Sequence, residues 1–105
     1  MEKETKMEKE TKMEKEMDFF VIGTSYFIRT VTHHYVGELS GVNCGGELLF
    51  RRASWIADDG RFCDMLKSGV FCEVEPFPPN KTVLINRTAI IDAVEWDHDL
   101  PRHQK

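Results

Sequence analysis

The chain has 105 residues, which allows one small domain. Its net charge is −4 with neutral histidines, which argues against broad binding of a nucleic-acid backbone by many Lys and Arg side chains. No apolar run approaches the roughly 18 residues that span a bilayer, and no apolar signal-peptide core begins the chain. We therefore expect a cytoplasmic protein with no membrane partner. Three cysteines without a CxxC pair predict reduced thiols, and we expect no metal or cofactor.

The first segment is a repeat of the six-residue unit Met-Glu-Lys-Glu-Thr-Lys over residues 1–16. A period of six turns successive methionines to different sides of a helix, so no apolar seam forms. Glu–Lys pairs four residues apart favour a solvated helix, and the composition also suits disorder. We expect residues 1–17 to be a charged arm, helical or disordered, which is solvated or joins subunits. A duplicated coding segment, with Met17 as the natural start, is a further interpretation.

Short strands dominate the domain expected over residues 18–96. Runs rich in β-branched and aromatic residues predict five strands, at residues 26–32, 35–40, 47–56, 82–87 and 90–96. Gly37, inside the second strand, predicts a bulge or a tight bend. The apolar run at residues 18–22 has the length of an additional edge strand, and its phenylalanines are expected to cover one end of the core.

A short helix and a proline-rich loop separate the third and fourth strands. Phe62, Met65 and Leu66 have the spacing of one helix face, and Gly69 is suited to end the helix. Residues 70–75 extend only briefly before the prolines of residues 76–79 impose a loop. The tail at residues 97–105 is polar and is expected to fray. The whole pattern predicts a mainly β fold, a small five-stranded open barrel with one short helix. Its small core favours oligomerisation.

Two parts of the chain resemble an Sm-like (SH3-type) barrel. Residues 35–39, Tyr-Val-Gly-Glu-Leu, match the aromatic-x-Gly-x-Leu second strand, and residues 83–91 match the last two strands with an arginine in the turn between them. The loop at residues 41–46 lacks that family's usual Asp and Met-Asn, and the connection at residues 61–81 is longer. The resemblance implies a homo-oligomeric ring. It also implies RNA as a partner, which the acidic charge disfavours.

The order of several weak motifs is similar to small uncharacterised proteins of bacteriophage and prophage genomes. The motifs span most of residues 26–96: Arg29-Thr30, Gly37 to Leu39, Glu47 to Ile56, then Gly60, Leu66 and Gly69. This resemblance implies a phage or prophage origin and the cytoplasm of a bacterial host.

Arginine and aromatic residues supply the candidate ligand-binding site: Arg29, Arg51, Arg52, Trp55, Asn86 and Arg87. Guanidinium groups suit phosphate, and an indole ring stacks on a base. Strand alternation places Arg51 and Arg52 on opposite faces of the sheet. The histidines at the first turn, His33 and His34, are candidates for a ligand-facing rim. Alternatively, the arginines form inter-strand or inter-subunit ion pairs with Glu38, Glu47, Asp58 and Asp59, and the histidines are solvated.

No catalytic motif stands out. The nearest constellation, Asp97-His98-Asp99, lies in the polar tail, so we do not expect an enzyme. The leading hypothesis is a non-catalytic, oligomeric, phage-type barrel that binds a small anionic ligand such as a nucleotide. By analogy with phage proteins that sequester nucleotide signals, the ligand would be a host immune signal. Two alternatives are an Sm-like RNA-binding ring and a structural or partner-binding phage assembly protein.

Overall fold

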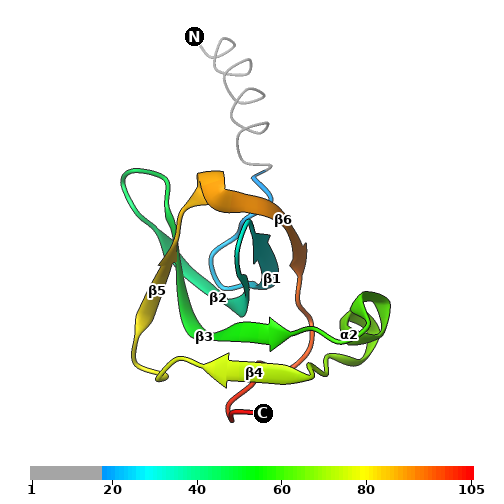
Figure 1. Ribbon diagram of the computed structural model, residues 1–105. Coiled ribbons are helices and arrows are strands. Elements are labelled where there is room, and N and C mark those ends of the chain that lie inside the picture. Colours follow the sequence, from blue (N-terminus) through cyan, green and yellow to red (C-terminus); the bar gives the residue numbers. More distant parts are fainter. Residues whose placement is uncertain (1–17) are drawn as a thin grey trace, which may run out of the picture.

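The computed structural model describes residues 18–105, so the predicted arm lies outside the described residues. Figure 1 shows a curved antiparallel sheet with a short helix at one side. The elements in chain order are β1 (Ser25–Thr30), β2 (His34–Val42), β3 (Leu48–Asp58), α2 (Phe62–Ser68), β4 (Glu73–Pro76), β5 (Thr82–Ile85), the 3₁₀ helix η1 (Arg87–Ala89) and β6 (Ile90–Glu95). The prediction of a mainly β fold with a short helix is confirmed. The run at residues 18–22 is not a strand, although Phe20 does pack against the core.

The sheet is open and has six strands instead of the five predicted. Its order is β4-β3-β2-β1-β6, and β5 pairs with the first half of β3 while β4 pairs with the second half. Within residues 18–105 no ladder joins β5 to β6, so the sheet does not close. The additional strand, β4, lies where the sequence predicted only a brief extension.

A β-bulge lets β3 change its partner halfway along. The register of β2 against β3 shifts between Val36 and Glu38, which confirms the irregularity predicted at Gly37. A Cβ at Gly37 would lie 2.9 Å from Cβ and 3.0 Å from Cα of Ala53, so only glycine fits this close approach. On β3 the extra residue is Arg52, which adopts a left-handed φ of 52°. Bulges of this kind bend the strand.

The hydrophobic residues form two clusters, because alternate residues of a strand face opposite sides of the sheet. Tyr26 and Ile28 of β1 belong to an inner cluster, whereas Phe27 between them belongs to an outer cluster. The inner cluster also contains Leu39, Leu48, Phe50, Ala53 and Ile85. The outer cluster also contains Val36, Ile56, Met65, Phe71, Val74 and Trp96.

Helix α2 covers the outer cluster with two of the three residues of the predicted face. Met65 is buried and Leu66 is partly buried, while Phe62 at the start of the helix is exposed. Gly69 ends the helix at φ 76°, and its N–H donates to the carbonyl of Met65 over 2.8 Å. Cys44, Cys63 and Cys72 are all free and exposed. Among residues 18–105, no helix is both long and apolar enough to cross a membrane.

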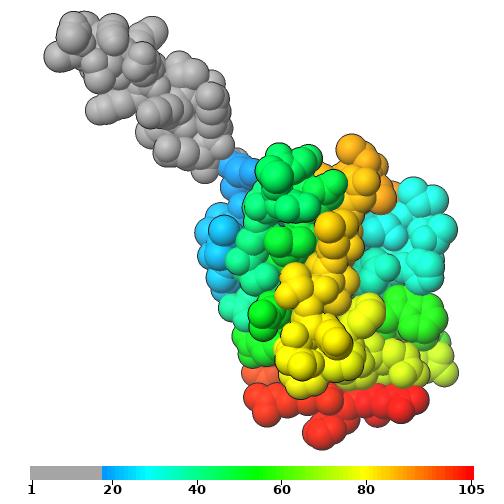
Figure 2. Space-filling model, turned by 90° about the vertical axis from the view of Figure 1, so that its left-hand side faces the viewer, coloured from blue at the N-terminus to red at the C-terminus, as the bar shows by residue number. Residues whose placement is uncertain are grey.

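The C-terminal segment does not fray, and that prediction is wrong. The imidazole Nε2 of His98 lies 2.8 Å from the carbonyl oxygen of Leu66 at the end of α2. Further along, Lys105 and Val74 exchange two backbone hydrogen bonds of 2.9 and 3.1 Å, so the segment pairs with β4. In Figure 2 this segment, in red, lies along the base of the molecule below the yellow β4–β5 connection. Backbone hydrogen bonds thus hold residues 97–105 in place, although their polar side chains predict a frayed tail.

Candidate functional site

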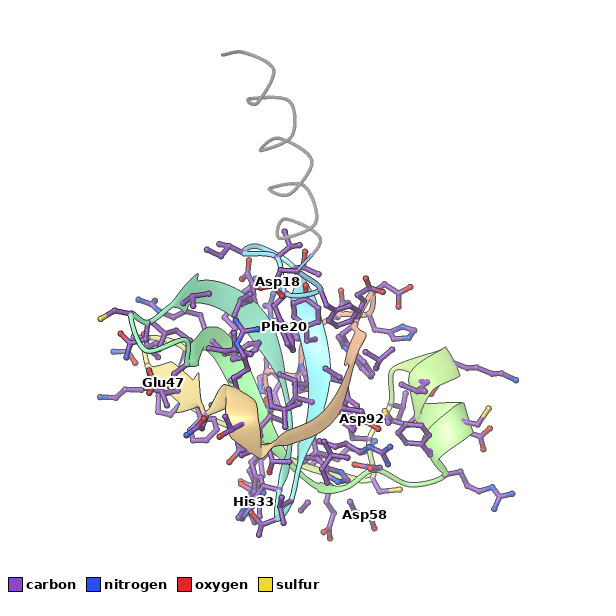
Figure 3. The ribbon with its side chains drawn as sticks, turned by 90° about the horizontal axis from the view of Figure 1, so that it is seen from above. Asp18, Phe20, His33, Glu47, Asp58 and Asp92 are labelled. Atoms are coloured by element: carbon purple, nitrogen blue, oxygen red, sulfur yellow. The ribbon has the colours of Figure 1, made fainter. Side chains whose placement is uncertain are left out.

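The eight residues predicted for a ligand site do not form one site. Figure 3 shows the spread through residues that it labels: Asp18 and Phe20 lie far from His33, and Glu47 lies across the molecule from Asp92. Arg87 lies beside Phe20, and Arg29 is paired with Asp92. The predicted residues therefore divide among separate places.

Arg29 and His34 belong to a charged cluster that holds the start of α2 against the sheet. Arg29 of β1 forms a bidentate ion pair with Asp92 of β6, with 2.8 Å between Nε and Oδ1, and its guanidinium stacks on the ring of Phe62. Hydrogen bonding to Arg29 lowers the pKa of Asp92, and the same bond raises the pKa of Arg29. His34 Nδ1 lies 2.9 Å from a carboxylate oxygen of Asp59. Asp92 is not among the acidic residues of the ion-pair alternative, and His34 is paired with Asp59 where that alternative had it solvated. Both pairs leave little donor capacity for a ligand.

Asn86 and Arg87 stabilise the turn between β5 and β6. The side-chain oxygen of Asn86 accepts a hydrogen bond from the Thr88 amide and so caps η1. Arg87 Nε donates to the carbonyl of Gly46 over 3.1 Å, and its guanidinium lies above the ring of Phe20. Both residues therefore have local structural partners.

Arg51 and Arg52 lie on the same face of the sheet, and the prediction of opposite faces is wrong. Their flanking residues, Phe50 and Ala53, both enter the inner cluster, so the bulge leaves both arginines outside. Arg51 Nε donates to the hydroxyl of Thr82 over 3.0 Å. Arg52 pairs with Glu38. The left-handed φ of Arg52 breaks the alternation on which the prediction depended.

Arg52 lines a groove of about 800 Å³ between β3, the β4–β5 connection and the C-terminal segment at residues 97–105. Its basic groups are the guanidinium groups of Arg52 and Arg102 and the imidazole of His103. Asp99 supplies the carboxylate of the lining. The other lining residues are apolar or proline: Ala53, Pro76, Phe77, Pro79, Leu100 and Pro101.

The C-terminal segment forms one wall of this groove because several contacts dock it. The Trp96 indole N–H donates to the carbonyl of Asp99 over 3.3 Å, and Leu100 packs against the outer cluster. Gln104 donates to the carboxylate of Glu75 over 3.1 Å. These contacts hold the stretch that carries Arg102 and His103 at the groove that Arg52 also lines.

Trp55 and His33 line a second, shallower hollow of about 380 Å³, which we call the aromatic shelf. The ring centroids of His33 and Trp55 are 5.5 Å apart, and Tyr35 lies opposite Trp55 in the β2–β3 ladder. The remaining lining residues are Glu75, Pro76, Phe77 and Pro78. The structure therefore brings together two of the predicted residues that lie far apart in the sequence.

The groove and the shelf adjoin, because Pro76 and Phe77 line both. The sequence analysis missed four functional candidates, namely Tyr35, Phe77, Arg102 and His103. Phe77 lies between prolines, and Arg102-His103 is a basic pair that follows a proline. The basic pair at residues 102–103 becomes a candidate only once the tail is known to pack, and neither pattern by itself marks a residue that lines a hollow.

Two other chemistries find no support in the geometry of residues 18–105. No group of three or more His, Cys, Asp or Glu side chains is arranged to hold a metal ion in this range. In the Asp97-His98-Asp99 constellation, the His98 side chain is engaged in packing and hydrogen-bonding contacts. The His98 ring contacts Trp96 and the carbonyl of Leu66, and its Nε2 lies 3.6 Å from a carboxylate oxygen of Asp97.

Comparison with known proteins gives no family for this chain. No protein-family model matches it, and no curated protein sequence matches it. The resemblances to Sm-like barrels and to phage proteins therefore stay predictions.

Proposed function

We propose that this chain is a non-catalytic binding module for a small anionic ligand, held in the groove between Arg52 and Arg102. The observation that carries the proposal is that Arg52, Arg102 and His103, from two segments far apart in the sequence, line the same hollow. Guanidinium groups form bidentate, charge-assisted hydrogen bonds with phosphate and carboxylate groups.

Arg102 is the residue on which the proposal depends most. Within the described residues it has no ion-pair partner, whereas Arg52 shares its charge with Glu38. An arginine without an internal partner in a hollow retains its full capacity for an external anion. Arg52 would also donate to the ligand, through the guanidinium N–H groups that do not bond to Glu38.

The size and charge of the molecule favour a small ligand over a nucleic-acid polymer. A groove of about 800 Å³ is within the range of small-molecule sites, roughly 300–1,000 Å³. The chain carries a net charge of −4, which would repel a phosphate backbone outside the groove. For this reason we rank an RNA-binding ring below a small-ligand module.

A homo-oligomer is part of the proposal, together with a phage origin and the sequestration of a host signal. The oligomer is supported by β5 and β6, each of which pairs with a single strand among the described residues and so leaves one edge open. The origin and the sequestering role rest on the sequence resemblance alone. Light scattering should give a mass of two or more subunits, and a monomer would contradict the oligomer.

The groove is tested with ribose 5-phosphate, a phosphate ester without an aromatic ring. Calorimetric titration should detect binding to the full chain, and Arg102→Ala should weaken it by about tenfold or more. Arg61→Ala is the matched control, because Arg61 is an exposed arginine that does not line the groove and should bind normally. Absence of binding, or equal affinity of Arg102→Ala and the wild type, would refute the proposed function.

A further inference from the structure

The aromatic shelf leaves a large aromatic side chain accessible beside the groove. Trp55 is 38% exposed, whereas Trp96 is only 4% exposed within the outer cluster. Trp55 does not complete either core cluster, and its ring neighbour is the His33 imidazole at 5.5 Å. An accessible indole that no core requires is free to stack on a planar ligand.

The walls of the shelf are rigid, so binding a ligand would cost little conformational entropy of the protein. Pro76 and Pro78 have fixed φ angles, and the Phe77 amide donates to the carbonyl of Ala53 over 2.9 Å. Tyr35 is anchored in the β2–β3 ladder directly opposite Trp55. A preformed aromatic surface of this kind binds rings with little reorganisation.

Charge decides the orientation of a ligand that occupies both hollows. Glu75 lines the shelf, so an anionic group is disfavoured there, whereas in the groove the guanidinium groups of Arg52 and Arg102 outweigh the single carboxylate of Asp99. The Glu75 carboxylate accepts a hydrogen bond from Gln104 and keeps further lone pairs for an N–H donor on the ligand. The shelf thus suits a neutral planar ring that carries an amino group.

We propose that the aromatic shelf binds the base of a nucleotide whose phosphate lies in the groove, with Pro76 and Phe77 between the two subsites. This inference rests on the proposed function, because it assigns the ligand class of the same site. Trp55 and Tyr35 supply the stacking surface, and Glu75 accepts a hydrogen bond from the amino group of the base. Adenine, guanine and cytosine carry such a group, and uracil does not.

The experiment compares four probes on the full chain by calorimetric titration: AMP, ribose 5-phosphate, CMP and UMP. AMP should bind about tenfold more tightly than ribose 5-phosphate, since stacking a base on an aromatic side chain gives roughly that gain. AMP should also quench the fluorescence of the exposed Trp55. CMP should bind more tightly than UMP, and Glu75→Ala should remove that difference.

Substitution at the shelf separates stacking from folding. Trp55→Ala should abolish the advantage of AMP over ribose 5-phosphate while leaving ribose 5-phosphate affinity unchanged. Trp55→Leu, which keeps apolar bulk without an aromatic face, should behave in the same way. Ile91→Ala is the control, because Ile91 is an exposed apolar strand residue outside both hollows.

The outcomes distinguish failure of the base-binding shelf, of the role of Glu75 and of the anion groove. Equal affinities for AMP and ribose 5-phosphate would overturn the base-binding shelf and leave the anion groove standing. Equal affinities for CMP and UMP would overturn the role of Glu75. Binding of neither AMP nor ribose 5-phosphate would refute the groove itself, and the shelf with it.

Discussion

The two halves of β3 differ in what covers their outer face. Residues Ala53 to Asp58 lie beneath the outer cluster, which α2 and the C-terminal segment complete. Residues Leu48 to Arg51 pair with β5 instead, and their outer face stays open beside exposed Leu84. Side chains therefore cover both faces of the second half of β3, but only the inner face of its first half. The groove lies at the boundary between the two halves of β3, where Arg52 and the C-terminal segment both line it.

Removing a side chain from the outer cluster, which covers the second half of β3, should have the largest effect. Phe27→Ala should lower the free energy of unfolding by about 3–5 kcal/mol, because the ring is 1% exposed and contacts Phe71 and Trp96. Leu84→Ala, on β5 beside the open half, should change it by less than about 0.5 kcal/mol, since that side chain is 52% exposed. Urea denaturation measures both. Equal losses would show that the two halves are covered alike.

An intermediate effect is expected where the docked segment meets α2. A Cβ at Gly69 would lie 2.5 Å from the His98 ring, so Gly69→Ala should cost about 2–3 kcal/mol and weaken docking of the segment. Gly46→Ala is the matched control, because Gly46 also has a positive φ but open space around it. It should cost only about 1 kcal/mol, the penalty for the left-handed conformation. Hydrogen exchange at residues 97–105 should accelerate in Gly69→Ala alone.

The smallest effect should come from the charged cluster at the start of α2. The Arg29 guanidinium lowers the pKa of Asp92, so this pair stabilises the fold above the ordinary carboxyl pKa of about 3.9. That contribution is lost as the pH falls through the lowered pKa of the folded state. Because Asp92 is half-exposed, we expect less than about 1 kcal/mol. Denaturation between pH 5 and pH 2 should be less pH-dependent in Asp92→Asn, and an unchanged profile would contradict the assignment.

The elements that could be predicted are those with a regular pattern of apolar side chains or a glycine that interrupts or ends them. Strands β1 to β3, the bulge at Gly37 and the end of α2 at Gly69 belong to this group. The pairing of Lys105 with Val74 could not be predicted, because backbone hydrogen bonds hold that segment and its side chains show no apolar alternation.

Residue type alone singled out some of the residues that line the two hollows, and whether they bind a ligand stays a prediction. Arg52, Trp55 and His33 were singled out by residue type, and they line the two hollows. Arg102 was set aside with the tail. The shared face of Arg51 and Arg52 depends on a left-handed φ at an arginine, a conformation that this residue type does not signal.

The pairing of β1 with β6 joins the first strand of the sheet to the last one. Contacts between residues so distant in the chain form slowly, whereas the neighbouring strands β2 and β3 are able to pair early. The segment that carries Arg102 and His103 follows β6 directly. We therefore expect the groove to assemble in the final folding step. An intermediate built on β1 to β3 would already pair Tyr35 with Trp55 of the aromatic shelf, but it would not yet have an anion site.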